Sequence, residues 1–186
     1  MYRILVNIFV ELFVLKKYRA SVRFKMLGYP SKMQVLKKAK SVGVGFGCGG
    51  ANETRVNRNT VIGDYVGTNG LVVQGEGDVI IGNRVIIASG CVICSDNHDY
   101  DHGTILPFDS GVIKKTVEIG DYVWIGTRCT ILPGTKIGEG AIIQAGSVVH
   151  GEIPPCAIAG GNPAKVFKYR DIEHYNKVKA EMEGKK

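Results

Sequence analysis

The stretch IGDYVWIGTRCTILPGTKIGEGAIIQAGSVVH, residues 119–150, repeats with a period of six. In each six-residue repeat, or hexad, one position holds a β-branched aliphatic residue: Ile119, Ile125, Ile131, Ile137, Ile143 and Val149. The place two residues earlier holds a small or β-branched residue: Val123, Cys129, Thr135, Ala141 and Ser147. An amphipathic helix would need a period of 3.6. A period of six predicts a prism-shaped parallel β-helix, in which three hexads make one coil.

The same frame continues upstream of this stretch. Ile81, Ile87 and Ile93 are six residues apart, while an earlier series starting at Val56 and Ile62 is offset by one extra residue. A single hexad cannot bury its own apolar side, so we expect the aliphatic side chains to point inward and stack coil upon coil. Cys91 and Cys129 occupy the small inward place, which predicts core residues rather than metal ligands.

Composition excludes some classes of protein. The chain has 186 residues, 45% of them hydrophobic, which is enough for one domain with a core. The chain has five cysteines, an odd number, and their spacing is irregular. This pattern argues against a framework of disulfide bonds and favours a protein of the reducing cytoplasm. The net charge of +7 is concentrated in residues 1–40, with ten Lys/Arg and one acid. The repeat region is nearly neutral, which argues against a nucleic-acid-binding protein.

The basic N-terminal segment, residues 1–40, opens with the apolar run ILVNIFVELFVL at residues 4–15. This run is too short to span a bilayer, and KKYRASVRFK follows it. Two interpretations remain open: a helix that makes peripheral contact with a membrane, or a helix packed on the domain or a partner subunit. We expect the repeat domain to occupy residues 41–170 and a short charged helix or tail to occupy residues 171–186.

The hexad frame breaks between Ile93 and Ile119. Those 26 residues replace two coil sides, which would need about twelve, so we predict a protruding loop at about residues 94–118. Long insertions in repeat proteins usually carry function. This one contains two histidines and four acids: His98, His102, Asp96, Asp99, Asp101 and Asp109.

Together these motifs resemble the hexapeptide-repeat, or left-handed β-helix, acyltransferases. The resemblance rests on the hexads, the NHD of residues 97–99 and the run from DYVWIG to GGNPAKV at residues 121–166, and it covers about residues 50–170. It is strongest toward galactoside, maltose and capsule-sugar O-acetyltransferases. It implies an all-β left-handed parallel β-helix and a homotrimer with active sites between subunits. It also implies acetyl transfer from acetyl-CoA to a hydroxyl of a sugar or surface-polysaccharide precursor, without a metal, in the cytoplasm or at the inner face of the membrane.

The resemblance also implies a catalytic residue. Attack of a hydroxyl on a thioester needs a general base, and histidine suits that role near neutral pH. His98 stands at the position of the family's catalytic histidine, with His102 as the alternative. A carboxylate or backbone carbonyl is expected to orient the ring, and Asp96, Asp99 and Asp101 are all candidates.

Cofactor and acceptor residues follow from the same match. Trp124 is expected to line the pantetheine channel or, alternatively, to seal a subunit contact. The expected acetyl-CoA contacts are Trp124, Gly126, Thr127, Ala145, His150, Gly151, Lys165 and Lys168. The two lysines replace arginines that are frequent in the family, and Arg170 is expected to support them at the phosphates. The expected acceptor contacts are Asn69 and Glu76.

Three other functions stay open from sequence. The acceptor can be an antibiotic hydroxyl, as in chloramphenicol or streptogramin acetylation, or the amine of an amino sugar. A zinc enzyme like the γ-class carbonic anhydrases uses the same prism, and here His98, His102 and His150 would have to converge. A non-catalytic trimeric scaffold is the third alternative.

Overall fold

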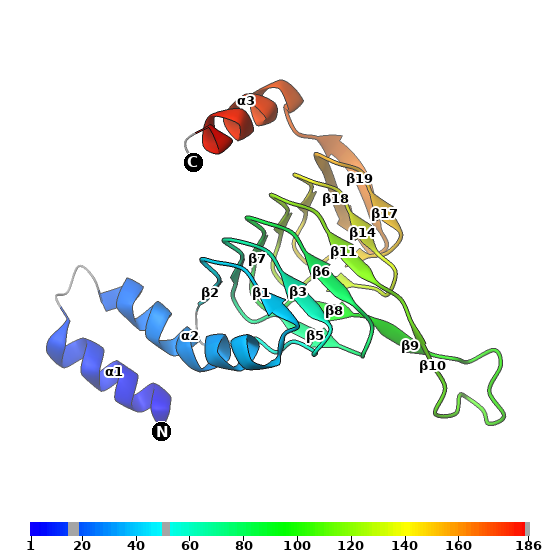
Figure 1. Ribbon diagram of the computed structural model, residues 1–186, viewed down its shortest axis with the longest axis horizontal. Helices are drawn as coiled ribbons and strands as arrows, with labels where there is room; N and C mark the ends of the chain where they lie inside the picture. The colour runs from blue at the N-terminus through cyan, green and yellow to red at the C-terminus, as the bar shows by residue number, and fades with distance from the viewer. Residues whose placement is uncertain (15–18, 50–52, 185–186) are drawn as a thin grey trace.

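The computed structural model describes residues 1–14, 19–49 and 53–184. It is a left-handed parallel β-helix with helices at both ends and one protruding loop, which confirms the predicted fold class (Figure 1).

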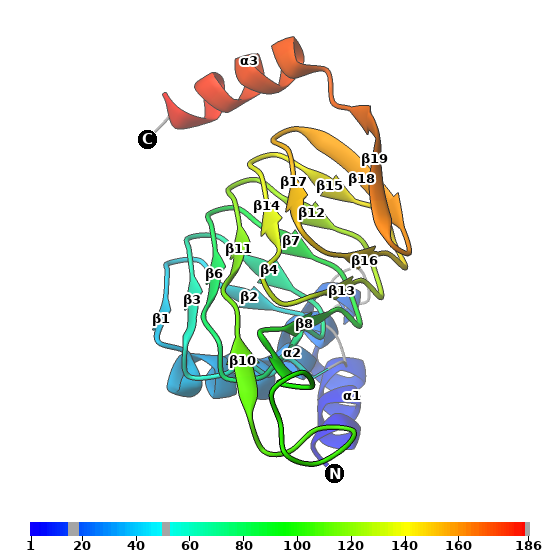
Figure 2. The ribbon, with the colours of Figure 1, turned by 90° about the vertical axis from the view of Figure 1, so that its right-hand side faces the viewer.

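Three sheets form the faces of the prism (Figure 2). Face A contains β1 (Ser41–Val42), β3 (Thr60–Ile62), β6 (Val79–Ile81), β11 (Val117–Ile119), β14 (Lys136–Ile137) and β17 (Glu152–Ile153). Face B contains β2 (Gly47–Cys48), β4 (Gly67–Thr68), β7 (Ile86–Ile87), β12 (Trp124–Ile125), β15 (Ile142–Ile143), β18 (Ala157–Gly161) and the antiparallel β19 (Ala164–Tyr169). Face C contains β5 (Val72–Gln74), β8 (Val92–Cys94), β13 (Thr130–Ile131) and β16 (Val148–Val149).

The core consists of in-register stacks of the predicted aliphatic residues. On face B, for example, Ile87 pairs with Ile125 and Ile125 with Ile143, and all three side chains are buried. Burying one such side chain stabilises the fold by about 1.5–3 kcal/mol. Cys91 and Cys129 are also buried within this core, as the repeat predicted.

The extra residue upstream arises from two unequal corners. Thr68 takes the inward place on face B, Val73 on face C and Ile81 on face A. The step from Thr68 to Val73 is therefore one residue shorter than a hexad, and the step from Val73 to Ile81 is two residues longer. The Asn57 side chain fastens the longer corner, because its Nδ2 donates to the carbonyl oxygen of Gly75 at 2.9 Å.

The interruption of the frame forms an arm, which we define as residues 95–116. It leaves face C after β8, pairs β9 (Asp96–His98) with β10 (Val112–Lys114) and returns at β11 on face A (Figure 1). The arm lies at a single corner, where the step from Ile93 on face C to Ile119 on face A takes 26 residues in place of the six of a regular hexad. The insertion is thus longer than the sequence expectation, which assigned two coil sides to the gap.

Two helices cover the first coil. Helix α2 (Arg19–Lys38) lies on β2, with Gly28 against the carbonyl of Cys48, and the hydroxyl of Ser31 accepts a hydrogen bond from the backbone N–H of Thr54 at 3.1 Å. Helix α1 (Tyr2–Phe13) packs on α2 and buries Val6 and Val10. Within the described residues, no helix combines the length and the apolar character that a membrane crossing requires.

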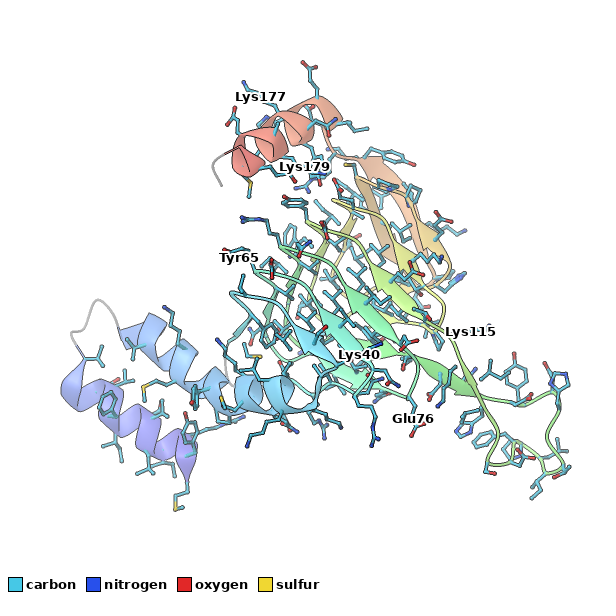
Figure 3. The ribbon with its side chains drawn as sticks, in the orientation of Figure 1. Lys40, Tyr65, Glu76, Lys115, Lys177 and Lys179 are labelled. Carbon is cyan, nitrogen blue, oxygen red and sulfur yellow. The ribbon has the colours of Figure 1, made fainter. Side chains whose placement is uncertain are left out.

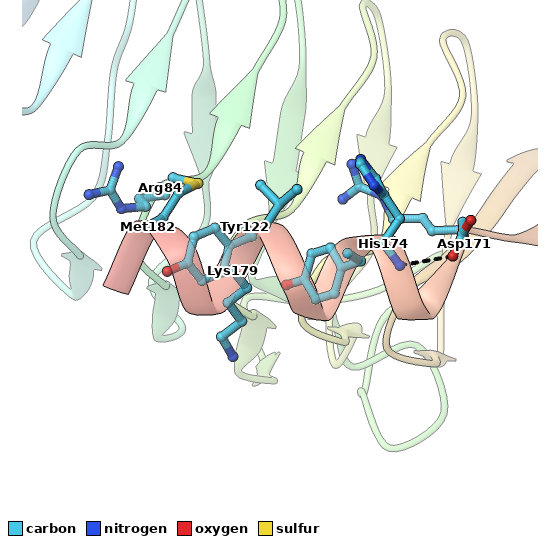
Figure 4. A pocket seen from close by; sticks show the side chains of 9 residues that line it. Arg84, Tyr122, Asp171, His174, Lys179 and Met182 are labelled. Carbon is cyan, nitrogen blue, oxygen red and sulfur yellow. Dashed lines mark hydrogen bonds between the residues drawn. The ribbon is translucent and has the colours of Figure 1, made fainter. Parts of the chain in front are cut away.

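The third helix, α3 (Ile172–Glu183), lies along the corner between faces A and B. Its first turn is capped by Asp171, and Tyr175 and Lys179 both reach Glu139, at 2.9 and 2.7 Å. A pocket of about 370 Å³ separates the helix from the prism, and Tyr122 and His174 are among its lining residues (Figure 4). Of the residues predicted for the site, Arg170 lines this pocket, whereas the expected catalytic, acceptor and other cofactor residues do not.

We expect Gly28→Ala to lower the free energy of unfolding by about 1–3 kcal/mol, because the new Cβ collides with the carbonyl oxygen of Cys48. Helix propensity alone would predict the opposite, a gain of up to about 1 kcal/mol. Urea unfolding measures the difference. Gly47→Ala is the matched control, since a Cβ there meets nothing within 4 Å. Equal stability of the two variants would show that α2 does not dock closely on the first coil.

Candidate active site

An apolar groove with a volume of about 500 Å³ lies on the outer side of face B. Its walls come from Trp124, Ile142, Ile158 and Phe167. The Trp124 side chain is 53% exposed, so its ring is available to a ligand. The structure therefore brings together four of the residues predicted to bind acetyl-CoA, all of which line this groove: Trp124, Gly126, Thr127 and Ala145.

The corner between faces B and C offers free donors to the groove. A Cβ on Gly126 would lie 2.5 Å from the backbone nitrogen of Ala145, so only glycine lets successive coils approach this closely. The Thr127 hydroxyl is fixed, because it donates to the carbonyl of Ser89 at 2.7 Å. Among the described residues, the backbone N–H groups of Thr127 and Ala145 have no acceptor. Two unused N–H donors thus stand one coil apart on the groove's edge.

Lys165 and Lys168 lie at the end of the groove. In an antiparallel pair, directly opposed residues point to the same face. Lys168 opposes Ile158, an outward residue of the groove, and Lys165 opposes Gly160. A bulge at this point inserts Phe167 and so places both lysines on the outer side.

Arg170 does not support the two lysines as expected. Its guanidinium donates to the carbonyl of Gly140 at 3.1 Å and lies over the Tyr175 ring. These contacts hold it at the A–B corner beside α3, because the chain turns out of β19 immediately before it. The cationic end of the groove therefore consists of Lys165 and Lys168.

Asn69 lines a second depression of about 380 Å³, which adjoins the groove because Ala88 borders both. Its side-chain Oδ1 is buried, yet it accepts no hydrogen bond from the described part of the chain. An unsatisfied buried carbonyl oxygen costs free energy, which a donor hydroxyl of a ligand would recover. This fits the expected acceptor role of Asn69.

Glu76, His150 and Gly151 lie away from the groove, at the corner between faces C and A. Glu76 pairs with Lys114 at 2.9 Å, and this contact lowers the pKa of the Glu76 carboxyl. Figure 3 shows Glu76 near the base of the arm. Within one chain, the predicted site residues therefore form two separate groups. One group lies on face B and at the corner between faces B and C, and the other lies at the corner between faces C and A.

His98 ends β9 and is exposed on the arm. Its ring stacks on Phe108, with 3.7 Å between the ring centroids. No hydrogen bond from residues 1–14, 19–49 or 53–184 reaches either ring nitrogen. Of the three carboxylates expected to orient it, Asp96 accepts from the backbone N–H of Glu76 at 2.8 Å and so anchors the arm to the coil. Asp99 contacts another histidine, and Asp101 does not bond to His98.

His102 pairs with Asp99, whose Oδ1 lies 2.9 Å from the ring Nδ1. This hydrogen bond and the negative charge raise the pKa of His102 and lower the pKa of Asp99. A raised pKa enlarges the protonated fraction of the His102 ring, and a protonated imidazole cannot accept a proton as a general base. The geometry thus favours His98 over His102 as the base.

Metal ligation finds no support in the geometry of a single chain. Within the described residues, no three His, Cys, Asp or Glu side chains gather where they could hold a metal ion. Cys91 and Cys94, which begin and end the sequence CVIC at residues 91–94, point in different directions. The Cys91 thiol donates to the carbonyl of Gly126 inside the core, and the Cys94 thiol faces Gln74 outside it.

Comparisons with known proteins show which families the whole chain is similar to. Residues 116–151 match the family model described as bacterial transferase hexapeptide (six repeats). The galactoside O-acetyltransferase of Escherichia coli strain K12 is 34% identical over 110 residues, which are 58% of this chain and 53% of that protein. A chloramphenicol acetyltransferase of Klebsiella aerogenes is 35% identical over 121 residues, with 56% and 58% covered. The chain thus spans about half the length of the curated relatives it matches.

A solved structure of galactoside acetyltransferase in complex with coenzyme A has the same fold. It superimposes with a TM-score of 0.67 at 24% identity, covering 92% of this chain and 81% of that one. The predicted resemblance to the hexapeptide-repeat acyltransferases is therefore confirmed.

We expect Asp99→Asn to lower the pKa of His102 toward its ordinary value of about 6.5, because the variant removes the charge that stabilises the imidazolium. An NMR titration of the His102 ring protons in the native chain and in the variant measures this shift. An unchanged His102 pKa would contradict the observed pairing.

Proposed function

We propose that the protein is an acetyl-CoA-dependent O-acetyltransferase that acts on a sugar hydroxyl. The observation that carries this proposal is the groove on face B. Its apolar walls suit the pantetheine arm, its two unused N–H donors suit amide or thioester carbonyls, and its two lysines suit phosphate groups. Acetyl-CoA carries all three of these chemical groups.

In the proposed mechanism, transfer is direct. An imidazole nitrogen of His98 takes the proton from the acceptor hydroxyl as its oxygen attacks the thioester carbonyl. Negative charge develops on the carbonyl oxygen, and the unused backbone N–H of Thr127 is the donor proposed to stabilise it. When the C–S bond breaks, the CoA thiolate receives the proton from the His98 imidazolium. The products are the acetyl ester and free CoA.

We also propose that a second copy of the chain completes the site, in a homotrimer. The groove lies beside the B–C corner, whereas His98, His150, Gly151 and Glu76 lie at or beyond the C–A corner. The arm exposes Ile105 and Leu106, and face B exposes Ile86 and Trp124. Face A, by contrast, presents charged pairs such as Lys136–Glu118. An arm that covers a neighbour's groove would bury both apolar surfaces and bring His98 to the thioester.

The sugar acceptor is supported by the buried oxygen of Asn69 and by the galactoside O-acetyltransferase among the relatives. A precursor of a surface polysaccharide is the form of sugar we favour. The chloramphenicol acetyltransferase relative supports an antibiotic hydroxyl as the second candidate. A panel of sugars, nucleotide-sugars, glycan fragments, amino sugars and chloramphenicol separates these acceptors, with release of free thiol from acetyl-CoA as the readout.

We expect His98→Ala to lower kcat for thiol release by about 10²–10⁴-fold, the usual contribution of a general base. His102→Ala is the matched control on the same arm and should keep kcat within about threefold, because the His102 side chain is 79% exposed and its pair with Asp99 lies at the surface.

The opposite pattern, with activity lost in His102→Ala and kept in His98→Ala, would move the base to His102. Thiol release by neither the native protein nor any variant, together with no binding of acetyl-CoA, would refute the transferase. If the protein then contained zinc, the alternative of a zinc enzyme like the γ-class carbonic anhydrases would be supported. If it contained no zinc, the alternative of a non-catalytic trimeric scaffold would be supported.

We expect the double variant Lys165→Ala/Lys168→Ala to raise KM for acetyl-CoA about tenfold while leaving KM for acetyl-pantetheine unchanged. Acetyl-pantetheine lacks the phosphates, so it has no partner for the lysines. Lys136→Ala is the control, since that lysine is also exposed but lies on face A. A similar rise in KM for both donors would place the lysines' effect on the groove's structure rather than on phosphate binding.

A further inference from the structure

Helix α1 has an exposed apolar face that the fold leaves uncovered. Its Val6 and Val10 are buried against α2, while Ile4, Leu5 and Ile8 are 63%, 58% and 51% exposed. At 100° per residue, these three side chains point away from the buried pair. Globular surfaces seldom expose adjacent large aliphatic residues on one helix without a binding role.

The length of α1 fits a helix that lies on a bilayer. Its 12 residues extend for about 18 Å, whereas a bilayer's hydrocarbon core is about 30 Å thick. A short amphipathic helix of this kind binds with its axis in the plane of the interface and its apolar side chains among the acyl chains.

The positive charge of residues 1–40 indicates what kind of surface the apolar face of α1 binds. Residues 1–40 contain ten Lys/Arg and one acid, Glu11. Two copies of this segment would repel each other, which disfavours a second chain as the occupant of the apolar face. An anionic lipid surface attracts such a segment by about 1 kcal/mol per Lys or Arg that comes near it.

We propose that α1 docks the protein peripherally on an anionic membrane surface, with Ile4, Leu5 and Ile8 inserted and the basic residues at the headgroups. Figure 1 places α1 at the end of the coil opposite to β19 and α3. Docking through α1 therefore leaves Lys165, Lys168 and the nearby groove open to acetyl-CoA. If the proposed function holds, the acceptor would meet the enzyme at the bilayer surface; lipid binding itself does not depend on that function.

Vesicle co-sedimentation of the full chain, without acetyl-CoA or acceptor, tests this proposal. We expect binding to phosphatidylcholine vesicles that contain phosphatidylglycerol to exceed binding to pure phosphatidylcholine at least about tenfold, and to weaken as salt rises from about 0.05 to 0.5 M. Ile8→Ser should reduce the binding to anionic vesicles about tenfold, because one inserted side chain is lost.

Ile172→Ser is the matched control: Ile172 is 50% exposed, almost the same as Ile8, but lies on α3 at the other end of the molecule. It should bind vesicles like the native chain. Circular dichroism confirms that both variants are folded. The proposal is overturned by equal binding to neutral and anionic vesicles, by equal effects of the two substitutions, or by no binding at all. It is also overturned if Ile8→Ser changes the oligomeric state in sedimentation while vesicle binding stays constant, because the face would then be a contact between protein chains.

Discussion

Coil-on-coil stacking of inward aliphatic side chains is the interaction on which the structure depends. Each side chain touches the same place in the coil above and below, so the core is a set of columns rather than a cluster. Strands of two or three residues, which would be marginal alone, persist because every coil adds both a ladder of hydrogen bonds and a layer of buried surface. These columns fix the distance between successive coils along the axis of the β-helix. They therefore also fix the distance between the equivalent groups at the corners of successive coils.

The corners are where this prism can vary without disturbing its columns. At the B–C corner the chain remains tight, and Gly126 lets the Ala145 backbone approach closely enough to present two donors at coil spacing. At the C–A corner the same chain accepts a long insertion, because the arm leaves and re-enters between two adjacent faces. Its attachment is local: Asp96 ties it to Glu76, whose side chain in turn holds Lys114.

Much of this architecture follows from sequence. The hexads identify most of the inward residues, although Val73 lies outside their frame. Cys91 and Cys129 fall in the core because they occupy an inward place in the repeat. The groove residues could be found only through family resemblance, since neither residue type nor a free backbone N–H sets Thr127 and Ala145 apart: in the described part of the chain the corner residues Ser89 and Glu139 also leave their N–H without an acceptor. The role of Asp96 was missed because three acids surround His98 in sequence, and only the arm's path decides which of them faces the coil. Arg170 was misplaced because nothing local shows that the chain turns away from the sheet after Tyr169.

The bulge in β19 has a consequence for how this region can change. Two residues three apart on a regular strand point to opposite sides, so Lys165 and Lys168 share a side only because Phe167 shifts the parity of the strand. Gain or loss of a single residue there would separate the two charges while leaving composition, net charge and the columns of the core as they are. Whether both lysines point to the groove therefore depends on the one inserted residue of the bulge in β19. A comparison of sequences by residue type alone would not detect the loss of this arrangement.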